Sequence, residues 1–218
     1  MRTTSHNAEL RAPWAREAPT VIRSFSHPKA QRGITGNAAV NAQAVVDGDH
    51  QVIIATDLNN CAADSQTFTP MMEQARRNTG RAPKQALADA GYCSQANLAA
   101  AATLTGQTGT EFLIAPGRLG HDEAVAPAQR GRIPKDFTLK QRMARKLRTK
   151  AGQADYARRK AIVEPVFGQI ATLQGKHVLL RDLDNTRAEW ELLATCHNLR
   201  KLHGHLAVTG LGSLRPAI

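Results

Sequence analysis

Residues 41–115 alternate between segments of strand character and segments of helical character, and this alternation constrains the fold most. The runs Ala44–Val46 and Gln51–Thr56 flank a polar Asp-Gly pair, which is typical of a β-hairpin. The elements expected next are a helix at about 65–77, a strand at 85–88, a helix at 95–104 and a strand at 111–115. Hairpin, helix, strand, helix and strand in this order predict an α/β domain whose mixed sheet is flanked by helices.

Capping and turn residues give the expected ends of the helices. Ser94 can cap the helix that follows it, and Gly106 is expected to stop that helix after about Leu104. In the preceding helix, Met71 and Met72 share a face with other apolar residues. A methionine cofactor box would use such a pair, but core packing is the favoured interpretation.

The flanking regions differ in character from this middle part. Residues 1–40 are expected to be a poorly ordered N-terminal extension with a short strand at Val21–Phe25. Residues 41–206 are expected to form one domain, with residues 207–218 as a C-terminal tail. Within the domain, residues 116–137 predict a long loop, and segments 138–164 and 186–203 predict a basic helical C-terminal part.

Charge points toward a polyanionic partner. The 218 residues contain 29 Lys and Arg against 18 Asp and Glu, a formal net charge of +11. Ten of the basic residues, including Arg145, Lys146 and Arg148, fall between Lys135 and Lys160, where only two acids occur. A solvated basic surface is the plainer interpretation of net charge, but such clustering favours a surface that follows a phosphate backbone.

Other classes of protein are disfavoured. The three cysteines lie far apart without zinc-ligand spacing, so disulfide and zinc frameworks are not indicated. The first residues lack the apolar stretch of a signal peptide, and no apolar run is long enough for a membrane span. The cytoplasm is therefore the expected compartment.

Two carboxylates stand in settings that favour chemistry. Asp89 ends a small apolar strand and precedes a turn with Gly91, so its side chain is expected at the carboxyl edge of the sheet. Glu164 closes the apolar run Ala161–Val163 and is followed directly by Pro165, where a helix must kink or restart. Turn formation for Asp89 and a helical ion pair of Glu164 with Lys160 are the competing interpretations.

Asp47 and Asp49 lie in the hairpin turn. Metal ligation is one interpretation, but turn chemistry explains their position and is favoured. Both side chains are expected to point outward at the tip of the hairpin.

Four segments together resemble the DDE transposases of bacterial insertion sequences. YARRKAIVEPVFGQ at 156–169 resembles the helix that carries the catalytic Glu, and ADAGYCS at 88–94 resembles the segment of the second Asp. NAQAVVD at 41–47 resembles the hairpin upstream of that Asp, and Trp190 with HNL at 197–199 and Lys201-Leu202 matches the closing helix. The resemblance covers about residues 41–203 and implies a ribonuclease-H-like fold.

The resemblance implies metal-dependent hydrolysis and strand transfer of DNA phosphodiesters. Asp89 and Glu164 would then be catalytic metal ligands for Mg²⁺ or Mn²⁺, with two ions in the intact family site. Tyr156, Arg159 and Lys160 would contact DNA, as would Arg145, Lys146 and Arg148 of the basic stretch. The partners would be the insertion-sequence ends and the target DNA, with a homo-oligomeric synaptic complex at the nucleoid and no membrane association.

The sequence departs from the family pattern in three places. His27 stands where the first metal-binding Asp is expected, Ala171 replaces a Lys two turns after the Glu, and Lys160 rather than Arg159 has the family's spacing to Glu164. The resemblance also leads us to expect a site-specific DNA-binding region ahead of the catalytic part, and none is recognised in residues 1–40. These departures suggest a truncated or decayed copy that is catalytically weak or dead, because His is a poor ligand for Mg²⁺. Two alternatives therefore remain: a non-catalytic DNA-binding remnant, and a basic RNA-associated protein without metal chemistry.

Overall fold

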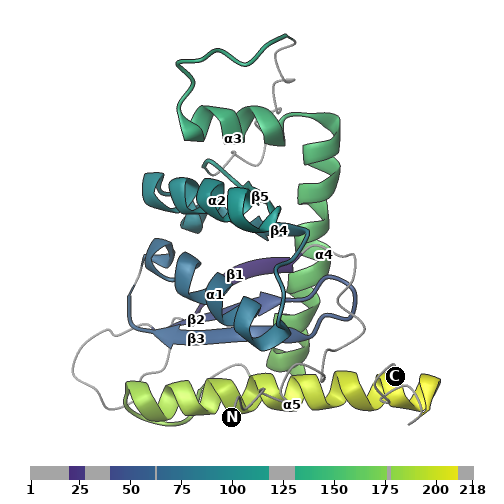
Figure 1. Cartoon of the computed structure of the whole chain (residues 1–218). Coiled ribbons are helices and arrows are strands. Elements are labelled where there is room, and N and C mark those ends of the chain that lie inside the picture. The colour runs from purple at the N-terminus through teal and green to yellow at the C-terminus, as the bar shows by residue number, and fades with distance from the viewer. Residues whose placement is uncertain (1–19, 28–39, 62, 118–130, 176–177, 211–218) are drawn as a thin grey trace, which may run out of the picture.

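Five strands form one mixed sheet in the computed structural model of the chain, which describes residues 20–27, 40–61, 63–117, 131–175 and 178–210. The strands are β1 (Thr20–His27), β2 (Val40–Val46), β3 (Ile53–Asn59), β4 (Gln85–Ala88) and β5 (Glu111–Ile114). Their spatial order is β3-β2-β1-β4-β5, and Figure 1 shows how they lie. Strand β2 pairs antiparallel with both β3 and β1, whereas β1, β4 and β5 run parallel.

Five α-helices and two short 3-10 turns complete the described fold. They are η1 (Asp64–Gln66), α1 (Phe68–Thr79), η2 (Ala90–Tyr92), α2 (Gln95–Thr108), α3 (Leu139–Leu147), α4 (Lys150–Leu173) and α5 (Leu183–Thr209). The sheet has three antiparallel strands followed by two parallel ones, and helices cover both of its faces. This is a ribonuclease-H-like fold, as the sequence predicts.

The sheet buries a separate apolar core on each face. Side chains that alternate along the strands explain this, because Val21 and Ile22 contribute to opposite cores. One core packs against α1 and α2, with Phe68, Tyr92 and Phe112 as its large rings. The other core packs against α4 and α5, where Phe167 and Trp190 stack with ring centroids 5.9 Å apart.

The long helices tie the ends of the molecule together. Figure 1 shows α4 running across the sheet from α3 to α5, and α5 running alongside β3. The Asn198 side-chain amide exchanges two hydrogen bonds of 2.8 Å with the backbone of Ile53 in β3. Further along, Arg187 Nε donates to the carbonyl of Leu58 at 3.2 Å. Helix α5 is thus fixed to the backbone of β3 as well as to the core.

Several expectations for individual elements need correction. The strand expected at Val21–Phe25 exists but is the central strand of the sheet, pairing with both β2 and β4. Helix α2 passes through Gly106 and ends instead at Gly109, whose φ of 74° is the left-handed conformation that glycine adopts readily. The helical segment expected at 138–164 is two helices, and the second does not restart at Pro165 but continues to Leu173.

Most of the expected N-terminal extension, long loop and C-terminal tail lies outside the described residues. Residues 1–19, 28–39, 118–130 and 211–218 are outside the described part of the chain. Among the helices that the structure describes, none is long and apolar enough to cross a membrane.

Candidate active site

Asp89 lies where β4 ends, at the carboxyl edge of the sheet as the sequence predicts. Its Oδ1 accepts a hydrogen bond of 3.1 Å from the Gly91 N–H, and its carbonyl accepts from Tyr92 N–H at 3.2 Å. These bonds shape the 3-10 turn η2 around the carboxylate. About a quarter of the Asp89 side chain remains exposed.

A buried polar network supports this turn from the side of β2. Asp64 packs directly against the backbone of Gly91, leaving no room there for a Cβ. Asp64 Oδ1 accepts hydrogen bonds from Asn41 Nδ2 at 2.6 Å and Gln43 Nε2 at 3.4 Å. Gln43 is fully buried, and its Oε1 accepts from the Tyr92 hydroxyl at 3.0 Å. The network holds η2 against β2 and η1.

Sequence reasoning missed this network. Asp64 lies in the polar loop before α1, and Asn41 and Gln43 lie in a strand rather than at a strand end. Asn41 and Gln43 are polar residues within an otherwise apolar run, and this was the available signal, because polar groups in a buried strand need partners.

Helix α4 meets the end of β4 through two predicted site residues. The Tyr156 hydroxyl donates to the carbonyl of Ala88 at 3.2 Å. The Arg159 guanidinium lies 5.3 Å from the Tyr156 ring centroid, and its Nη1 is 3.9 Å from Asp89 Oδ2. Arg159 is 13 % exposed and so is largely enclosed between the helix and the turn. The structure therefore brings Tyr156 and Arg159 together with Asp89.

Glu164 follows Arg159 on α4 by more than one helical turn. Its neighbours Val163 and Val166 are buried against the sheet, whereas Glu164 itself is exposed on the flank of the helix. Lys160, one turn before it, is also exposed. Both candidate carboxylates thus belong to elements that meet at the end of β4.

Asp47 corrects an expectation about the hairpin. It was expected to point outward, but it is 3 % exposed, and its Oδ2 accepts from His50 N–H at 2.8 Å. Burial raises the pKa of this carboxyl above 3.8, with the His50 N–H acting in the opposite direction. Asp49 is exposed, as expected. Asp47 therefore stabilises the hairpin turn. It follows the last residue of β2, whereas Asn41 lies at the other end of that strand.

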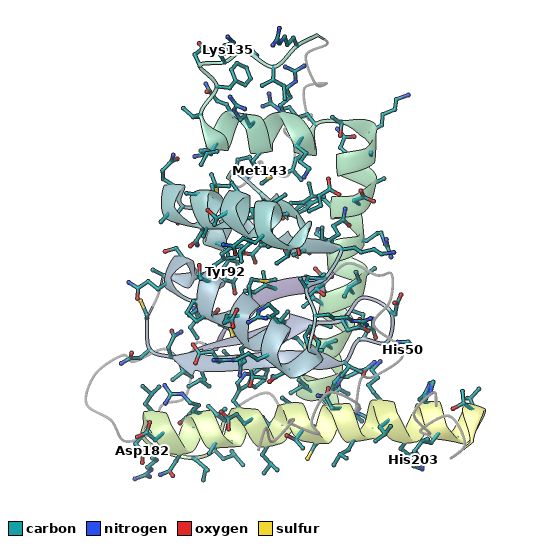
Figure 2. The ribbon with its side chains drawn as sticks, in the orientation of Figure 1. His50, Tyr92, Lys135, Met143, Asp182 and His203 are labelled. Atoms are coloured by element: carbon teal, nitrogen blue, oxygen red, sulfur yellow. The ribbon has the colours of Figure 1, made fainter. Side chains whose placement is uncertain are left out.

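The basic residues predicted to bind DNA differ in how they are held. Lys146 Nζ lies 2.9 Å from Glu111 Oε1 and donates to the carbonyl of Phe112 at 3.3 Å. Arg145 is directed at the backbone carbonyls of Gly131 and Arg132, whereas Arg148 is exposed. Figure 2 shows Lys135 at the α3 end of the molecule, opposite His203 on α5.

The donor chemistry at Asp89 and Glu164 suits a hard divalent cation, since carboxylate oxygens are its preferred ligands. Among the described residues, however, no group of three or more His, Cys, Asp or Glu side chains is placed to hold a metal. The register of β1 shows how far His27, which stands where the first metal-binding Asp is expected, lies from the level of Asp89. Ile22 pairs with Ala88, so Arg23 is level with Asp89, and His27 lies four residues further along. That separation is about 13 Å at 3.3 Å per residue.

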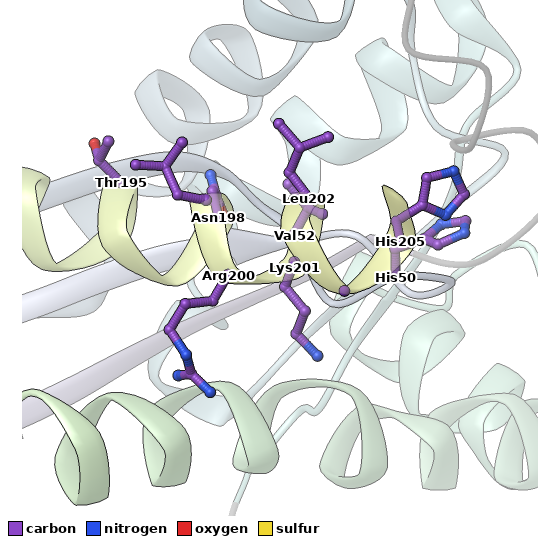
Figure 3. A pocket seen from close by; sticks show the side chains of 10 residues that line it. His50, Val52, Thr195, Asn198, Arg200, Lys201, Leu202 and His205 are labelled. Carbon is purple, nitrogen blue, oxygen red and sulfur yellow. The ribbon is translucent and has the colours of Figure 1, made fainter. Parts of the chain in front are cut away.

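A pocket of about 620 Å³ lies away from this edge, between α5 and the hairpin turn (Figure 3). Its wall is mostly apolar, and the rings of His50 and His205 meet edge to face with centroids 5.8 Å apart. In Figure 3, Arg200 and Lys201 extend from one side of α5 and Leu202 from the other. None of the predicted catalytic residues lines this pocket.

Comparison with known proteins identifies the family of the chain. Residues 12–199 match the family model described as the transposase DDE domain. No curated protein matches the chain.

Proposed function

The chain belongs to the transposase DDE domain family, and we propose that it is the catalytic domain of a bacterial insertion-sequence transposase that hydrolyses DNA phosphodiesters and transfers strands. The observation that carries the proposal is the docking of α4 on the end of β4. The Tyr156–Ala88 hydrogen bond and the approach of Arg159 to Asp89 join the two elements that carry the candidate ligands.

In this proposal Asp89 and Glu164 hold Mg²⁺ or Mn²⁺, with two ions in a complete site. A bound ion would polarise the scissile phosphate and lower the pKa of a water molecule. Arg159 lies beside Asp89 and would offset the negative charge of an approaching phosphate. Tyr156 orients that guanidinium through its ring, while Lys160 faces solvent where DNA would pass.

DNA is the proposed partner, both as the ends of an insertion sequence and as the target. Exposed cations such as Arg148, directly after α3, and Lys160 of α4 would follow its backbone. Lys146 contributes less in this proposal, because Glu111 already neutralises it. Action on two ends would require a homo-oligomeric synaptic complex, and the substrate would place the protein at the nucleoid in the cytoplasm.

A non-catalytic DNA-binding remnant is the second candidate. Two observations favour it: the described residues contain no cluster of three metal ligands, and the Arg159 cation lies 3.9 Å from Asp89, where it opposes a second positive charge. The remnant would keep the basic surface of α3 and α4 but would not cut DNA.

Nicking of supercoiled DNA with Mg²⁺ or Mn²⁺, together with Mn²⁺ titration calorimetry, distinguishes the two. Asp89→Asn and Glu164→Gln are each expected to reduce nicking by at least about a hundredfold, since losing a ligand removes several kcal/mol of transition-state stabilisation. Glu191→Gln, an exposed acid on α5, is the matched control and should act like the parent chain. Salt-dependent DNA binding without nicking or Mn²⁺ binding would instead establish the remnant.

A further inference from the structure

Pro165 leaves a carbonyl of α4 without its helical donor, one turn before the proline. In an α-helix the N–H of each residue bonds the carbonyl four residues earlier, and proline has no N–H. Helix α4 nevertheless continues through Pro165 for eight further residues. The carbonyl that loses its helical hydrogen bond in this way is that of Ala161, in the turn that leads into Glu164.

The missing donor is replaced from the hairpin turn between β2 and β3. Gln51 Nε2 donates to the Ala161 carbonyl at 3.1 Å, across 110 residues of sequence. A side-chain amide therefore occupies the place of the absent backbone N–H. The bond lies at the surface, where it replaces the missing backbone donor and ties the turn of α4 before Pro165 to the hairpin.

The orientation of the Gln51 amide is fixed by its other neighbour. Lys201 Nζ of α5 lies 2.9 Å from Gln51 Oε1, and an ammonium can only donate. Since Oε1 must face Lys201, Nε2 must face Ala161. Figure 3 shows Lys201 on the same side of α5 as Arg200, away from Leu202.

The Gln51 backbone is held as firmly as its side chain. Its N–H donates to the carbonyl of Asp47 at 3.1 Å, and its carbonyl lies 2.9 Å from Nε2 of the buried His197. Gln51 has a φ of 58°, an uncommon conformation for a residue with a side chain. Every polar group of Gln51 is thus engaged, and strain is tolerated to place it.

We infer that Gln51 is a positioning residue for Glu164: by replacing the hydrogen bond that Pro165 removes, it fixes the turn of α4 from which the Glu164 carboxylate projects. The inference rests on the proposed role of Glu164 as a metal ligand. Residues that hold ligands in place have measurable effects on metal affinity without touching the metal.

A double-mutant cycle with Mn²⁺ as the probe tests this directly. Gln51→Ala should raise the Mn²⁺ dissociation constant about tenfold, the lower end of the range for such supporting residues. In a Pro165→Ala background the new N–H bonds the Ala161 carbonyl, so Gln51→Ala should then cost less than about twofold. An equal loss in both backgrounds overturns the inference. Pro165→Ala should not destabilise the fold, because Ala is favoured in the interior of a helix.

Two further variants separate the possible causes. Gln51→Glu keeps a contact with Lys201 but directs oxygen at the Ala161 carbonyl, so it should lose affinity as Gln51→Ala does; unchanged affinity contradicts the inference. Gln153→Ala is the matched control, because Gln153 also donates from α4 to a backbone carbonyl, that of Arg148 at 3.4 Å. It should leave Mn²⁺ affinity unchanged.

The same titration distinguishes failure of the inference from failure of the proposed function. If Glu164→Gln abolishes Mn²⁺ binding while Gln51→Ala leaves it intact, the site stands and the positioning role is wrong. If Glu164→Gln has no effect, the proposed site itself is wrong and the positioning role falls with it. Urea unfolding provides a readout without metal, since the Gln51 and Pro165 substitutions should be coupled in stability as well.

Discussion

The turn that carries Asp89 and the helical segment that carries Glu164 are held in place by different means. Short-range bonds shape the Asp89 turn, since Gly91 and Tyr92 both donate to Asp89 within three residues. The Glu164 segment contains a helix-breaking residue and receives its missing hydrogen bond from Gln51, 110 residues earlier. The hydrogen bonds to Asp89 within its turn are thus local, although Asp64 also packs against that turn, whereas the Glu164 segment receives a hydrogen bond from a distant part of the chain.

This difference predicts how each element responds to change. A locally bonded turn should tolerate loosening of α5 but not intrusion of atoms into its tight backbone. The Glu164 segment should be sensitive to whatever holds α4, the hairpin turn and α5 together. Substitutions at the two places therefore test whether the contrast is real.

The largest expected effect is at the contact between α4 and α5. Phe167 lies one turn after Glu164, is 8 % exposed and stacks on Trp190. Phe167→Ala should lower the free energy of unfolding by about 3–5 kcal/mol, because it leaves a cavity in the core. Urea unfolding measures this. Leu173→Ala on the same helix, at 57 % exposure, should change stability by less than about 0.5 kcal/mol. Similar losses for both would mean that α4 is not anchored at Phe167.

An intermediate effect is expected at the Asp89 turn. Gly91→Ala places a Cβ against the Asp64 carboxylate, so the free energy of unfolding should fall by about 1–3 kcal/mol. The matched control is Gly106→Ala, in open space within α2, which should raise stability by roughly 0.5–1 kcal/mol. Adding Asp64→Ala to Gly91→Ala should recover part of the loss. A Gly91→Ala chain as stable as the parent would show that the turn is not tightly packed.

The smallest expected effect is a pH dependence from α5. Burial lowers the pKa of His197 below 6.5, although its bond to the Gln51 carbonyl acts in the opposite direction. The unfolded chain therefore binds a proton at higher pH than the folded one. Stability should be fully present above pH 6.5 and should fall as the pH drops through the folded pKa of His197. The loss of stability should be on the order of 1.4 kcal/mol per unit of pKa shift. Denaturant unfolding between pH 7.5 and 5 measures this loss.

A variant comparison assigns this pH dependence to one residue. His197→Gln should flatten the pH profile of unfolding, while His203→Gln, exposed on the same helix, should not. If the profile keeps its slope in His197→Gln, another group carries the dependence.

The sequence predicted the parts of this protein that are encoded by periodicity and turn chemistry. The hairpin, both parallel strands, the buried face of α1 with Met71 and Met72, and the place of Asp89 at the end of β4 are all confirmed. Each depends on residues within a few positions of one another.

What the sequence did not predict depends on contacts between distant segments. Pro165 indicated a break in the helix, but Gln51 supplies the donor that helps the helix to continue. The burial of Asp47 and the support of Asp89 by Asp64 likewise follow from packing of separate elements. The pairing of Ile22 with Ala88 determines which residue of β1 is level with Asp89. The register between two strands cannot be predicted from the sequence of either strand alone.

The amide of Asn198 has a consequence for association between molecules. A border strand with unpaired backbone groups is a template for another strand, and β3 is such a border in this sheet. Asn198 offers Ile53 the same donor and acceptor that an incoming peptide would offer, at 2.8 Å in each direction. An incoming strand therefore cannot pair with the backbone of Ile53 unless it displaces the Asn198 amide.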